Sequence, residues 1–313
     1  MNILITGICG QIGSHVADLL AARGDDVVGI ENFATGRPEH LPVRSGVRVV
    51  EGSIADRDLV ETVFAAFRPD VVIHTAASYK DPDDWHGDAM TNCIGGVNVI
   101  AASRRHGIGR FIYFQTALCY GLKPLKTPIP LDHPRNPANC SYAISKTTAE
   151  EYLEISGLDY VTFRLANVTG PRGLSGPLPI FFQRLGEGKR CFVTKARRDF
   201  VAAKDLARVV IRAADGIGSG TYHFSSGQDV AIMDLYRAVV SAMQLNDSPE
   251  PEIRELGPDD APSILLDPSR TFADFGDIEF TPMTRLVAEA VEYYKEFGVV
   301  GGYTHLKINM DNT

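Results

Sequence analysis

The stretch that decides the fold is Thr6-Gly7-Ile8-Cys9-Gly10-Gln11-Ile12-Gly13, near the start of the chain. It lies directly after the apolar run Ile3–Ile5 and opens a helical pattern over Ile12–Arg23. In dinucleotide-binding turns the first glycine permits a tight turn, the second admits a phosphate close to the backbone, and the third lets helix and strand pack closely. The N-terminus of the following helix adds amide donors and the positive end of its dipole. The stretch therefore predicts a site for a dinucleotide pyrophosphate, with contacts from the residues Gly7, Gly10, Gln11, Ile12 and Gly13.

The first half of the chain alternates short apolar runs with longer amphipathic ones. Strands are predicted at Ile3–Ile5, Val27–Ile30, Val47–Val50, Val71–His74, Phe111–Phe114 and Tyr160–Leu165. Helices are predicted at Ile12–Arg23, Arg57–Phe67, Asp88–His106 and Ser141–Ser156. Continuous apolar strands alternating with helices are typical of a parallel sheet covered on both faces. We expect an α/β fold with a Rossmann-type doubly wound parallel sheet.

The second half has a different composition, with prolines and glycines clustered after Leu165. Such clusters interrupt regular elements and favour loops and short helices. We therefore expect a smaller α/β lobe that binds the substrate. The predicted dinucleotide-binding domain spans residues 1–165, the chain returns to it around 201–226, and residues 166–313 form mainly the second lobe.

Composition excludes several classes of protein. The net charge of −8 gives no electrostatic reason to expect nucleic acid or an anionic membrane as a partner. The first residues lack a basic and apolar leader, and no stretch approaches the length of a membrane span. The five cysteines are scattered without a CxxC pair, and the eight histidines lack the spacing of metal ligands. We expect free thiols, no metal and a cytoplasmic location.

An acidic residue ends the second predicted strand, at Ile30-Glu31. A carboxylate at this position accepts hydrogen bonds from the adenosine ribose hydroxyls and repels a 2′-phosphate. Glu31 therefore favours NAD over NADP as the cofactor.

A tyrosine and a lysine, Tyr142 and Lys146, share one face of a predicted helix at positions i and i+4. A neighbouring ammonium, together with a positively charged nicotinamide, would lower the pKa of the phenol, so that a phenolate could act as a base near neutral pH. An exposed pair on an amphipathic helix is the alternative, because this spacing also occurs by chance.

Taken jointly, several motifs resemble those of the extended short-chain dehydrogenase/reductases, the NAD-dependent epimerase/dehydratase family that acts on nucleotide sugars. The resemblance covers nearly the whole chain and rests on Thr6–Gly13, Glu31-Asn32, His74-Thr75-Ala76-Ala77, Asn92, Phe114–Gly121, Tyr142–Lys146, Asn167–Pro171 and Arg198-Asp199-Phe200. The sequences of residues 77–85 and 114–121 resemble those of a narrower branch of the family. That branch includes sugar-nucleotide epimerases of bacterial O-antigen and related glycan pathways.

The resemblance implies a role for each matching residue. It makes Thr116 the hydroxyl that binds the reacting sugar oxygen, Tyr142 the general base, and Lys146 the residue that binds the nicotinamide ribose. It implies further cofactor contacts from Asn32, Ser53, Ile54, Ala76, Ala77 and Asn92. It implies substrate contacts from Asn167, Leu178, Phe192, Arg198 and Asp260, although Leu178 and Phe192 also fit a core. Lys80 is a further candidate for a substrate contact because it follows the fourth strand, where loops face the ligand crevice, although it also fits a solvated loop. The helices at Asp88–His106 and Ser141–Ser156 are those through which relatives form homodimers.

Two departures from the family pattern concern binding. Ser53-Ile54 stands where the family often has Asp-Ile to hold adenine. Gly257-Pro258-Asp259-Asp260 stands where the family has Arg-Pro-Gly-Asp, so an arginine is missing. Arg254 and Arg270 are the candidates to replace it.

A third departure concerns the reaction. Dehydratases of the family carry Asp-Glu after the catalytic threonine and decarboxylases carry a glutamate two positions after it, whereas this chain has Ala117 and Leu118. Neither side chain can transfer a proton, so dehydration and decarboxylation are disfavoured. We expect NAD-dependent C4 epimerisation of a UDP-hexose derivative through a transient 4-keto intermediate. An NAD(P)H-dependent reductase of nucleotide-4-keto-sugars is the alternative, and a non-catalytic dinucleotide-binding regulator is a weaker one. The sugar, its C6 substituent and the nucleotide base stay open.

Overall fold

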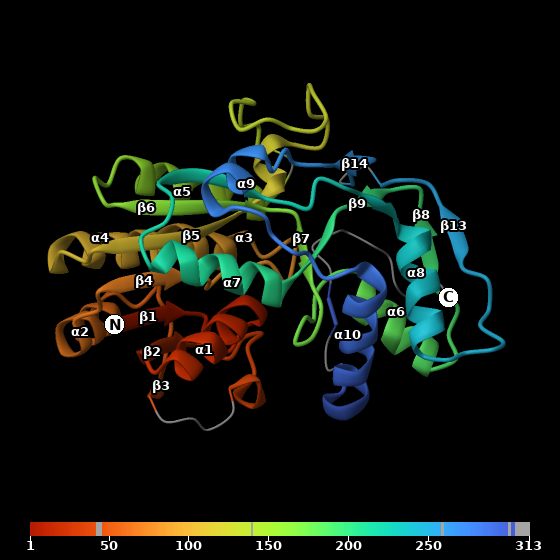
Figure 1. The fold of residues 1–313 in the computed structure, drawn as a ribbon, viewed down its shortest axis with the longest axis horizontal. Helices are drawn as coiled ribbons and strands as arrows, with labels where there is room; N and C mark the ends of the chain where they lie inside the picture. Colours follow the sequence, from red (N-terminus) through yellow and green to blue (C-terminus); the bar gives the residue numbers. More distant parts are fainter. Residues whose placement is uncertain (42–45, 139, 258–259, 300–301, 304–313) are drawn as a thin grey trace.

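Parallel strands form the central sheet, in the order β11-β6-β5-β4-β1-β2-β3 (Figure 1). The structure, a computed structural model, describes residues 1–41, 46–138, 140–257, 260–299 and 302–303. The strands of this sheet are β1 (Asn2–Thr6), β2 (Asp26–Glu31), β3 (Val47–Glu51), β4 (Val71–His74), β5 (Arg110–Thr116), β6 (Tyr160–Leu165) and β11 (Gly220–Phe224). All neighbours pair in parallel. The order reverses between β1 and β4, and this arrangement opens a crevice at the carboxyl ends of the strands.

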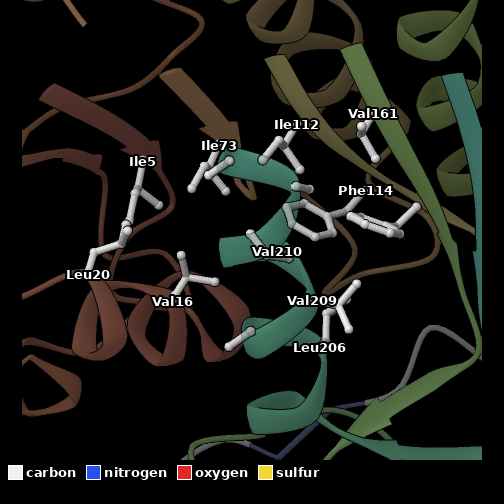
Figure 2. Packing of buried hydrophobic residues seen from close by; sticks show 14 of the residues in the cluster. Ile5, Val16, Leu20, Ile73, Ile112, Phe114, Val161, Leu206, Val209 and Val210 are labelled. Carbon is white, nitrogen blue, oxygen red and sulfur yellow. The ribbon is translucent and has the colours of Figure 1, made fainter. Parts of the chain in front are cut away.

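Helices cover both faces of the sheet. The helices α1 (Gln11–Arg23) and α7 (Ala203–Ala214) pack on one face. The helices α2 (Arg57–Phe67), α4 (Gly96–His106) and α5 (Ser141–Glu154) pack on the other. Figure 2 shows Val16 and Leu20 of α1 and Leu206, Val209 and Val210 of α7 directed at apolar side chains of the strands, among them Ile5, Ile73, Ile112, Phe114 and Val161. The predicted doubly wound sheet is confirmed.

The segment predicted as one helix over Asp88–His106 is built from three pieces. It begins earlier, with α3 (Trp85–Asp88), passes through the π-helical η2 (Ala89–Gly95), and ends with α4. Asp84 caps the first piece, since its Oδ1 accepts a hydrogen bond of 2.8 Å from the Gly87 amide. The π-helical turns carry Asn92, whose side chain bonds both backbone groups of Ser78 at 2.9 Å. This long-range contact is absent from any local pattern, so the sequence did not predict the break.

The second lobe consists of short strands and the helices α6 (Pro177–Gly186), α8 (Ile232–Ala242) and α10 (Met283–Phe297). These helices share an apolar core. Its small sheets pair β7 (Asn167–Thr169) with β10 (Phe200–Ala202), β8 (Phe192–Thr194) with β13 (Glu252–Arg254), and β9 (Arg197–Arg198) with both β12 (Val230–Ala231) and β14 (Ser263–Ile264). The remaining elements are α9 (Ser269–Phe275) and the 3₁₀ turns η1 (Pro38–His40) and η3 (Ala117–Tyr120). Figure 1 shows α6, α8 and α10 beside the carboxyl end of the sheet.

The chain joins the central sheet again after it has entered the second lobe. Strand β11 pairs with β6, and α7 packs against α1. These contacts support the proposed division into residues 1–165 with a return around 201–226, and residues 166–313 forming mainly the second lobe. In the described part of the chain, no helix has the length and apolar character needed to cross a membrane.

Candidate active site

A cavity of about 640 Å³ lies at the carboxyl edge of the sheet and extends into the second lobe. Its lining includes most of the predicted site residues: Gly7, Gly10, Gln11, Ile12, Glu31, Asn32, Ile54, Ala76, Ala77, Lys80, Thr116, Tyr142, Lys146, Asn167, Phe192, Arg198 and Asp260. These residues come from the ends of β1, β2, β4 and β5, from the start of α5, and from β7, β8 and β9. The fold therefore gathers distant motifs around one space large enough for elongated ligands.

The glycine loop has the geometry that a pyrophosphate requires. Gly7 has a φ of +69°, and a Cβ on it would lie 2.8 Å from the backbone of Ala76. Gly10 caps α1 without a side-chain hydrogen bond, and the first turn of this helix carries no acidic residue. The helix start therefore leaves backbone amides and a positive dipole end facing the cavity, which suits a doubly charged diphosphate.

Glu31 is held rigidly at the end of β2. Its carboxylate accepts backbone hydrogen bonds from Cys9 at 2.9 Å, from Asn32 at 3.0 Å and from Phe33 at 2.9 Å. A carboxylate has about four acceptor positions, so these amides leave room for about one ribose hydroxyl. We therefore expect Glu31 to bind one ribose hydroxyl, where the sequence suggested more than one. Its negative charge, which disfavours a 2′-phosphate, lies beside the cavity.

Thr116 and Tyr142 approach the cavity from neighbouring elements. Thr116 ends β5, and its Oγ1 accepts a hydrogen bond of 3.2 Å from the Leu118 amide. An oxygen that accepts from the backbone keeps its own proton for donation, so this hydroxyl can donate to a sugar oxygen. Tyr142 lies in the first turn of α5, and Lys146 follows one turn later on the same face. The residues after the threonine, Ala117 and Leu118, also line the cavity.

Burial acts in opposite directions on the two titratable residues of this group. It raises the pKa of the Tyr142 phenol well above its usual value, and Tyr79, Cys140 and Asp88 add to the effect. It lowers the pKa of Lys146 to about 7, against the opposing influence of Glu150 and Cys93. The chain alone therefore does not produce the lowered tyrosine pKa expected from the sequence. The positive charge of a bound nicotinamide would have to supply it.

Four predicted residues lie outside the cavity lining among the described residues. Gly13 packs α1 onto the loop, since a Cβ on it would clash with the Gly7 carbonyl oxygen and lie 2.9 Å from Thr75 Oγ1. The Ser53 hydroxyl accepts from the Ala55 amide at 3.1 Å. Leu178 is buried in the core of the second lobe, among α6, α8 and α10.

The fourth residue, Asn92, is 2% exposed and braces the turn that follows β4. Its amide bonds both backbone groups of Ser78 and donates to Ser145 Oγ, each at 2.9 Å. Both amide N–H donors of Asn92 are therefore occupied by the protein, and the side chain holds Ser78 next to the turn that follows β4. A cofactor contact by Asn92 stays a prediction.

Apart from Lys80 and Thr116, the residues expected to bind the substrate lie in the second lobe. Asn167 begins β7, and Arg198 lies in β9. The Arg198 guanidinium forms an ion pair with Asp260 and donates to the Ala261 carbonyl at 2.8 Å. Asp260 thus orients the arginine in this structure. The neighbouring residues 258–259 lie outside the described part of the chain.

Arg254 and Arg270 differ in their relation to the cavity. The Arg254 guanidinium lies 4.2 Å from the centroid of the Phe192 ring, which lines the cavity. Arg270 donates to the Thr221 and Ser219 carbonyls at 2.8 Å, at the strand β11. Of the two candidates, Arg254 contacts a residue that lines the cavity, whereas Arg270 is bound to backbone carbonyls beside β11.

Two tyrosines that the sequence analysis did not select stand beside Tyr142. The Tyr79 ring centroid lies 5.7 Å from that of Tyr142 and 5.3 Å from that of Tyr303. Tyr79 lies next to Lys80 in a stretch that the motif analysis quoted, whereas Tyr303 is brought in from the far end of the chain. Lys80 lines the same part of the cavity with an exposed side chain. In the described ranges, no cluster of three or more His, Cys, Asp or Glu side chains could hold a metal ion.

The doubly wound sheet, the glycine loop at its switch point and the tyrosine–lysine pair define a dinucleotide-binding protein of the short-chain dehydrogenase/reductase class. The model of the NAD dependent epimerase/dehydratase family matches residues 3–223. The chain belongs to this family, and the predicted family and its NAD dependence are confirmed.

Individual relatives agree with this assignment. A crystal structure of the Bordetella bronchiseptica enzyme WbmH in complex with NAD⁺ is 69% identical, with a TM-score of 0.94 and coverage of 95% of this chain and 99% of that one. The enzyme WbmG from the same organism, in complex with NAD and UDP, is 39% identical, with a TM-score of 0.90 and coverage of 98% and 99%. UDP-glucose 4-epimerase of Mycolicibacterium smegmatis is 30% identical over 94% of this chain and 99% of its own length.

Proposed function

We propose that this protein is an NAD-dependent nucleotide-sugar epimerase that inverts C4 of a UDP-hexose derivative through a transient 4-keto intermediate. The observation that carries the proposal is that Thr116, Tyr142 and Lys146 line the same cavity as the glycine loop, while Ala117 and Leu118 follow the threonine. This set can remove and return a proton and lacks the acid and base that dehydration needs. The relatives bound to NAD, to UDP or named as 4-epimerases support the same activity.

Each side chain has a task in this reaction. The Thr116 hydroxyl donates to the C4 oxygen, and the Tyr142 phenolate takes the proton of the C4 hydroxyl and later returns it. Lys146 stabilises the phenolate and holds the nicotinamide ribose. A bound nicotinamide would accept the hydride from C4 and give it back to the opposite face of the sugar.

The diphosphate of the substrate needs an anchor about which the keto sugar can turn. Asn167 of β7 and Arg198 of β9 line the part of the cavity that the second lobe contributes. Tyr142 and Lys146 line it from α5. Arginine suits this task because its planar fork of donors matches phosphate oxygens. Phe192, with Arg254 behind its ring, offers an aromatic face to a nucleotide base.

Identification of the bound ligands tests the proposal directly. Mass spectrometry of small molecules released from the purified protein should find NAD and show which nucleotide sugar copurifies. Incubation with UDP-glucose, UDP-galactose and their N-acetylated forms should then yield a mixture of C4 epimers without consumption of added cofactor. Stoichiometric consumption of NADH or NADPH with a keto sugar would instead identify the reductase.

Replacement of the general base separates binding from catalysis. The Tyr142→Phe variant should retain NAD and lose activity by about 100-fold or more, because only the phenolic proton acceptor is removed. Tyr152→Phe is the matched control, since Tyr152 lies on the same helix with 48% of its surface exposed. Epimerase rates and NAD content measured side by side decide the outcome. Full activity of Tyr142→Phe would contradict the assignment.

Two broader expectations belong to the same proposal. We infer that the protein forms a homodimer through α5 and the segment from α3 to α4, because apolar side chains on these helices are exposed, among them Trp85, Ile94 and Ile144. We also infer that it works in the cytoplasm, which the five free cysteines support.

A further inference from the structure

A buried carboxylate with no role in the reaction above lies one helical turn beyond Lys146. Glu150 of α5 is 0% exposed. Its Oε1 accepts from Arg164 Nε at 3.0 Å, and its Oε2 accepts from Gln115 Nε2 at 3.0 Å and from Arg135 Nη1 at 3.4 Å. Buried ion pairs add little net stability compared with apolar residues of similar size, because desolvation of the charges is costly. Their presence next to a catalytic residue therefore calls for a functional reason.

The first connection runs from Glu150 to Thr116. Gln115 donates to Glu150 through its amide nitrogen and accepts the Thr116 backbone N–H through its amide oxygen, at 2.8 Å. An ionised carboxylate only accepts hydrogen bonds, so it turns the nitrogen of Gln115 toward itself and the oxygen toward Thr116. Glu150 thereby sets the orientation of the group that holds the catalytic threonine at the end of β5.

The second connection runs from Glu150 to Lys146 through the electrostatic field. The groups that face the Lys146 ammonium are His74 from β4, Cys93 from η2, Tyr113 from β5, and Tyr142 and Glu150 from α5. Burial lowers the pKa of His74 to about 3 and raises the pKa of the Cys93 thiol and of both phenols, so these groups are neutral at pH 7. Among these described groups, the Glu150 carboxylate supplies the charge that favours the ammonium.

A chain of hydrogen bonds holds the other end of this network. Arg164 Nη1 donates to Tyr120 Oη at 2.6 Å, and Tyr120 Oη donates to His223 Nε2 at 2.6 Å. Burial lowers the pKa of His223 to about 4, so the ring carries one proton, which Nδ1 donates to the Asp267 carbonyl at 3.0 Å. Each hydrogen bond of this chain therefore has only one possible donor. The chain holds the Arg164 guanidinium in place, and Arg164 in turn holds the Glu150 carboxylate.

From this geometry we propose that Glu150 is a positioning residue of the active site, which keeps Lys146 in its ammonium form and aligns Thr116 through Gln115. The inference rests on the proposed epimerase function. In this proposal Glu150 touches neither cofactor nor sugar. It acts on Lys146 through its charge and on Thr116 through its hydrogen bond to Gln115.

The Glu150→Gln variant tests the electrostatic half. Without the carboxylate, Lys146 should lose its proton at a pH about one unit lower, and the alkaline limb of the activity profile should move down by the same amount. A readout independent of activity is the pH dependence of Lys146 acetylation by acetic anhydride in full-length protein freed of NAD, followed by peptide mass spectrometry. Its midpoint should fall by about one unit. Glu151→Gln is the matched control, because the Glu151 side chain is 59% exposed.

The Gln115→Ala variant tests the alignment half. It should lower kcat by about tenfold and leave the acetylation midpoint of Lys146 unchanged, because the carboxylate remains. If Glu150→Gln does not fold, the double variant Glu150→Gln/Arg164→Gln removes both buried charges and should lower the midpoint by a smaller amount, because loss of the Arg164 cation offsets part of the loss of the carboxylate. A folded variant with the wild-type acetylation midpoint overturns the proposal, and so does failure of both variants to fold, which would make Glu150 structural. Retained activity in Tyr142→Phe would refute the epimerase function alone, because the acetylation midpoint requires no turnover.

Discussion

Lys146 occupies a position where burial opposes its own charge. Its side chain is 3% exposed, and its Nζ lies 4.1 Å from the centroid of the Tyr113 ring, a cation–π contact that compensates part of the lost hydration. Its pKa falls from 10.5 in the unfolded chain to about 7 in the folded protein. Between these pH values the unfolded chain binds more protons than the folded one. The loss of folding stability caused by burying Lys146 is therefore largest below pH 7 and disappears as the pH rises toward 10.5.

The Lys146→Met variant should therefore be more stable than the wild type at low pH, while it loses activity. The gain in free energy of unfolding should be about 2–5 kcal/mol at pH 6 and should shrink steadily up to pH 10. Urea unfolding of NAD-free protein at several pH values measures it. Lys195→Met is the control, since that side chain is 70% exposed and should show no such pH dependence. An equal gain at every pH would contradict the low folded-state pKa.

At the scale of elements, the start of α1 and the end of β1 form the cofactor end of the site. The helix can approach the loop only because Gly13 has no side chain, since a Cβ would clash with the Gly7 carbonyl oxygen. The same close approach points the first amides of α1 into the cavity. Packing and phosphate binding thus depend on one glycine.

The Gly13→Ala variant should lose stability and NAD together. We expect a loss of about 1–3 kcal/mol from overpacking and at least about tenfold weaker NAD binding, because the loop must shift away from the helix. Chemical unfolding and calorimetric titration with NAD measure the two effects. The control is Gly186→Ala at the end of α6, where the nearest atom to an added Cβ is Met243 Cε at 4.0 Å. There alanine should be neutral or stabilising, and equal losses at both glycines would refute the argument.

At the scale of the whole molecule, exposed apolar side chains gather on α5 and on the neighbouring η2. Ile94 of η2 is 47% exposed, and Ile144 and Tyr152 of α5 are 49% and 48% exposed. The elements η2 and α5 contact each other, so these side chains belong to adjoining surfaces. Adjoining exposed apolar residues on a globular protein are typical of a surface that a partner covers.

The Ile144→Glu variant should separate the proposed dimer into folded monomers. A buried carboxylate without a partner opposes association strongly, whereas it is tolerated on a monomer surface. Size-exclusion chromatography with light scattering gives the mass, and circular dichroism gives the fold. Leu125→Glu is the control, because Leu125 is 82% exposed and lies outside these helices. A monomeric wild type would contradict the proposal outright.

Local patterns predicted the central sheet well because its inner strands, such as β1 and β4, are buried on both faces. The predicted runs Val71–His74 and Tyr160–Leu165 match β4 and β6 along their whole length, and Arg57–Phe67 matches α2. Helix α2 also has a clear local start, since Asp56 accepts from the amides of Asp58 and Leu59 at 3.0 and 3.1 Å. Where the hydrophobic period and the capping residues indicate the same element, its bounds can be predicted from the sequence without tertiary information.

The candidate site was predictable where a motif carries its own geometry and less so where packing decides. Residues such as Gly7, Tyr142 and Lys146 line the cavity because strand, turn and helix place them there. Asn92 and Leu178 come from the same family resemblance, yet the first is buried with both amide N–H donors bound by the protein, and the core of the second lobe encloses the other. A resemblance assigns a position to a motif, whereas exposure toward a ligand depends on every neighbour.

The sequence by itself determined the doubly wound sheet, the family, the dinucleotide cofactor and the tyrosine–lysine pair, because each follows from local motifs and from the order of apolar and amphipathic runs along the chain. Only the tertiary structure decided that Glu150, Gln115 and Arg164 form one buried network behind Thr116 and Lys146. These residues lie on α5, β5 and β6, and their hydrogen bonds exist only once the strands pair and the helix docks. Desolvation, which lowers the pKa of Lys146 to about 7, likewise arises from the assembled core and has no counterpart in a local pattern.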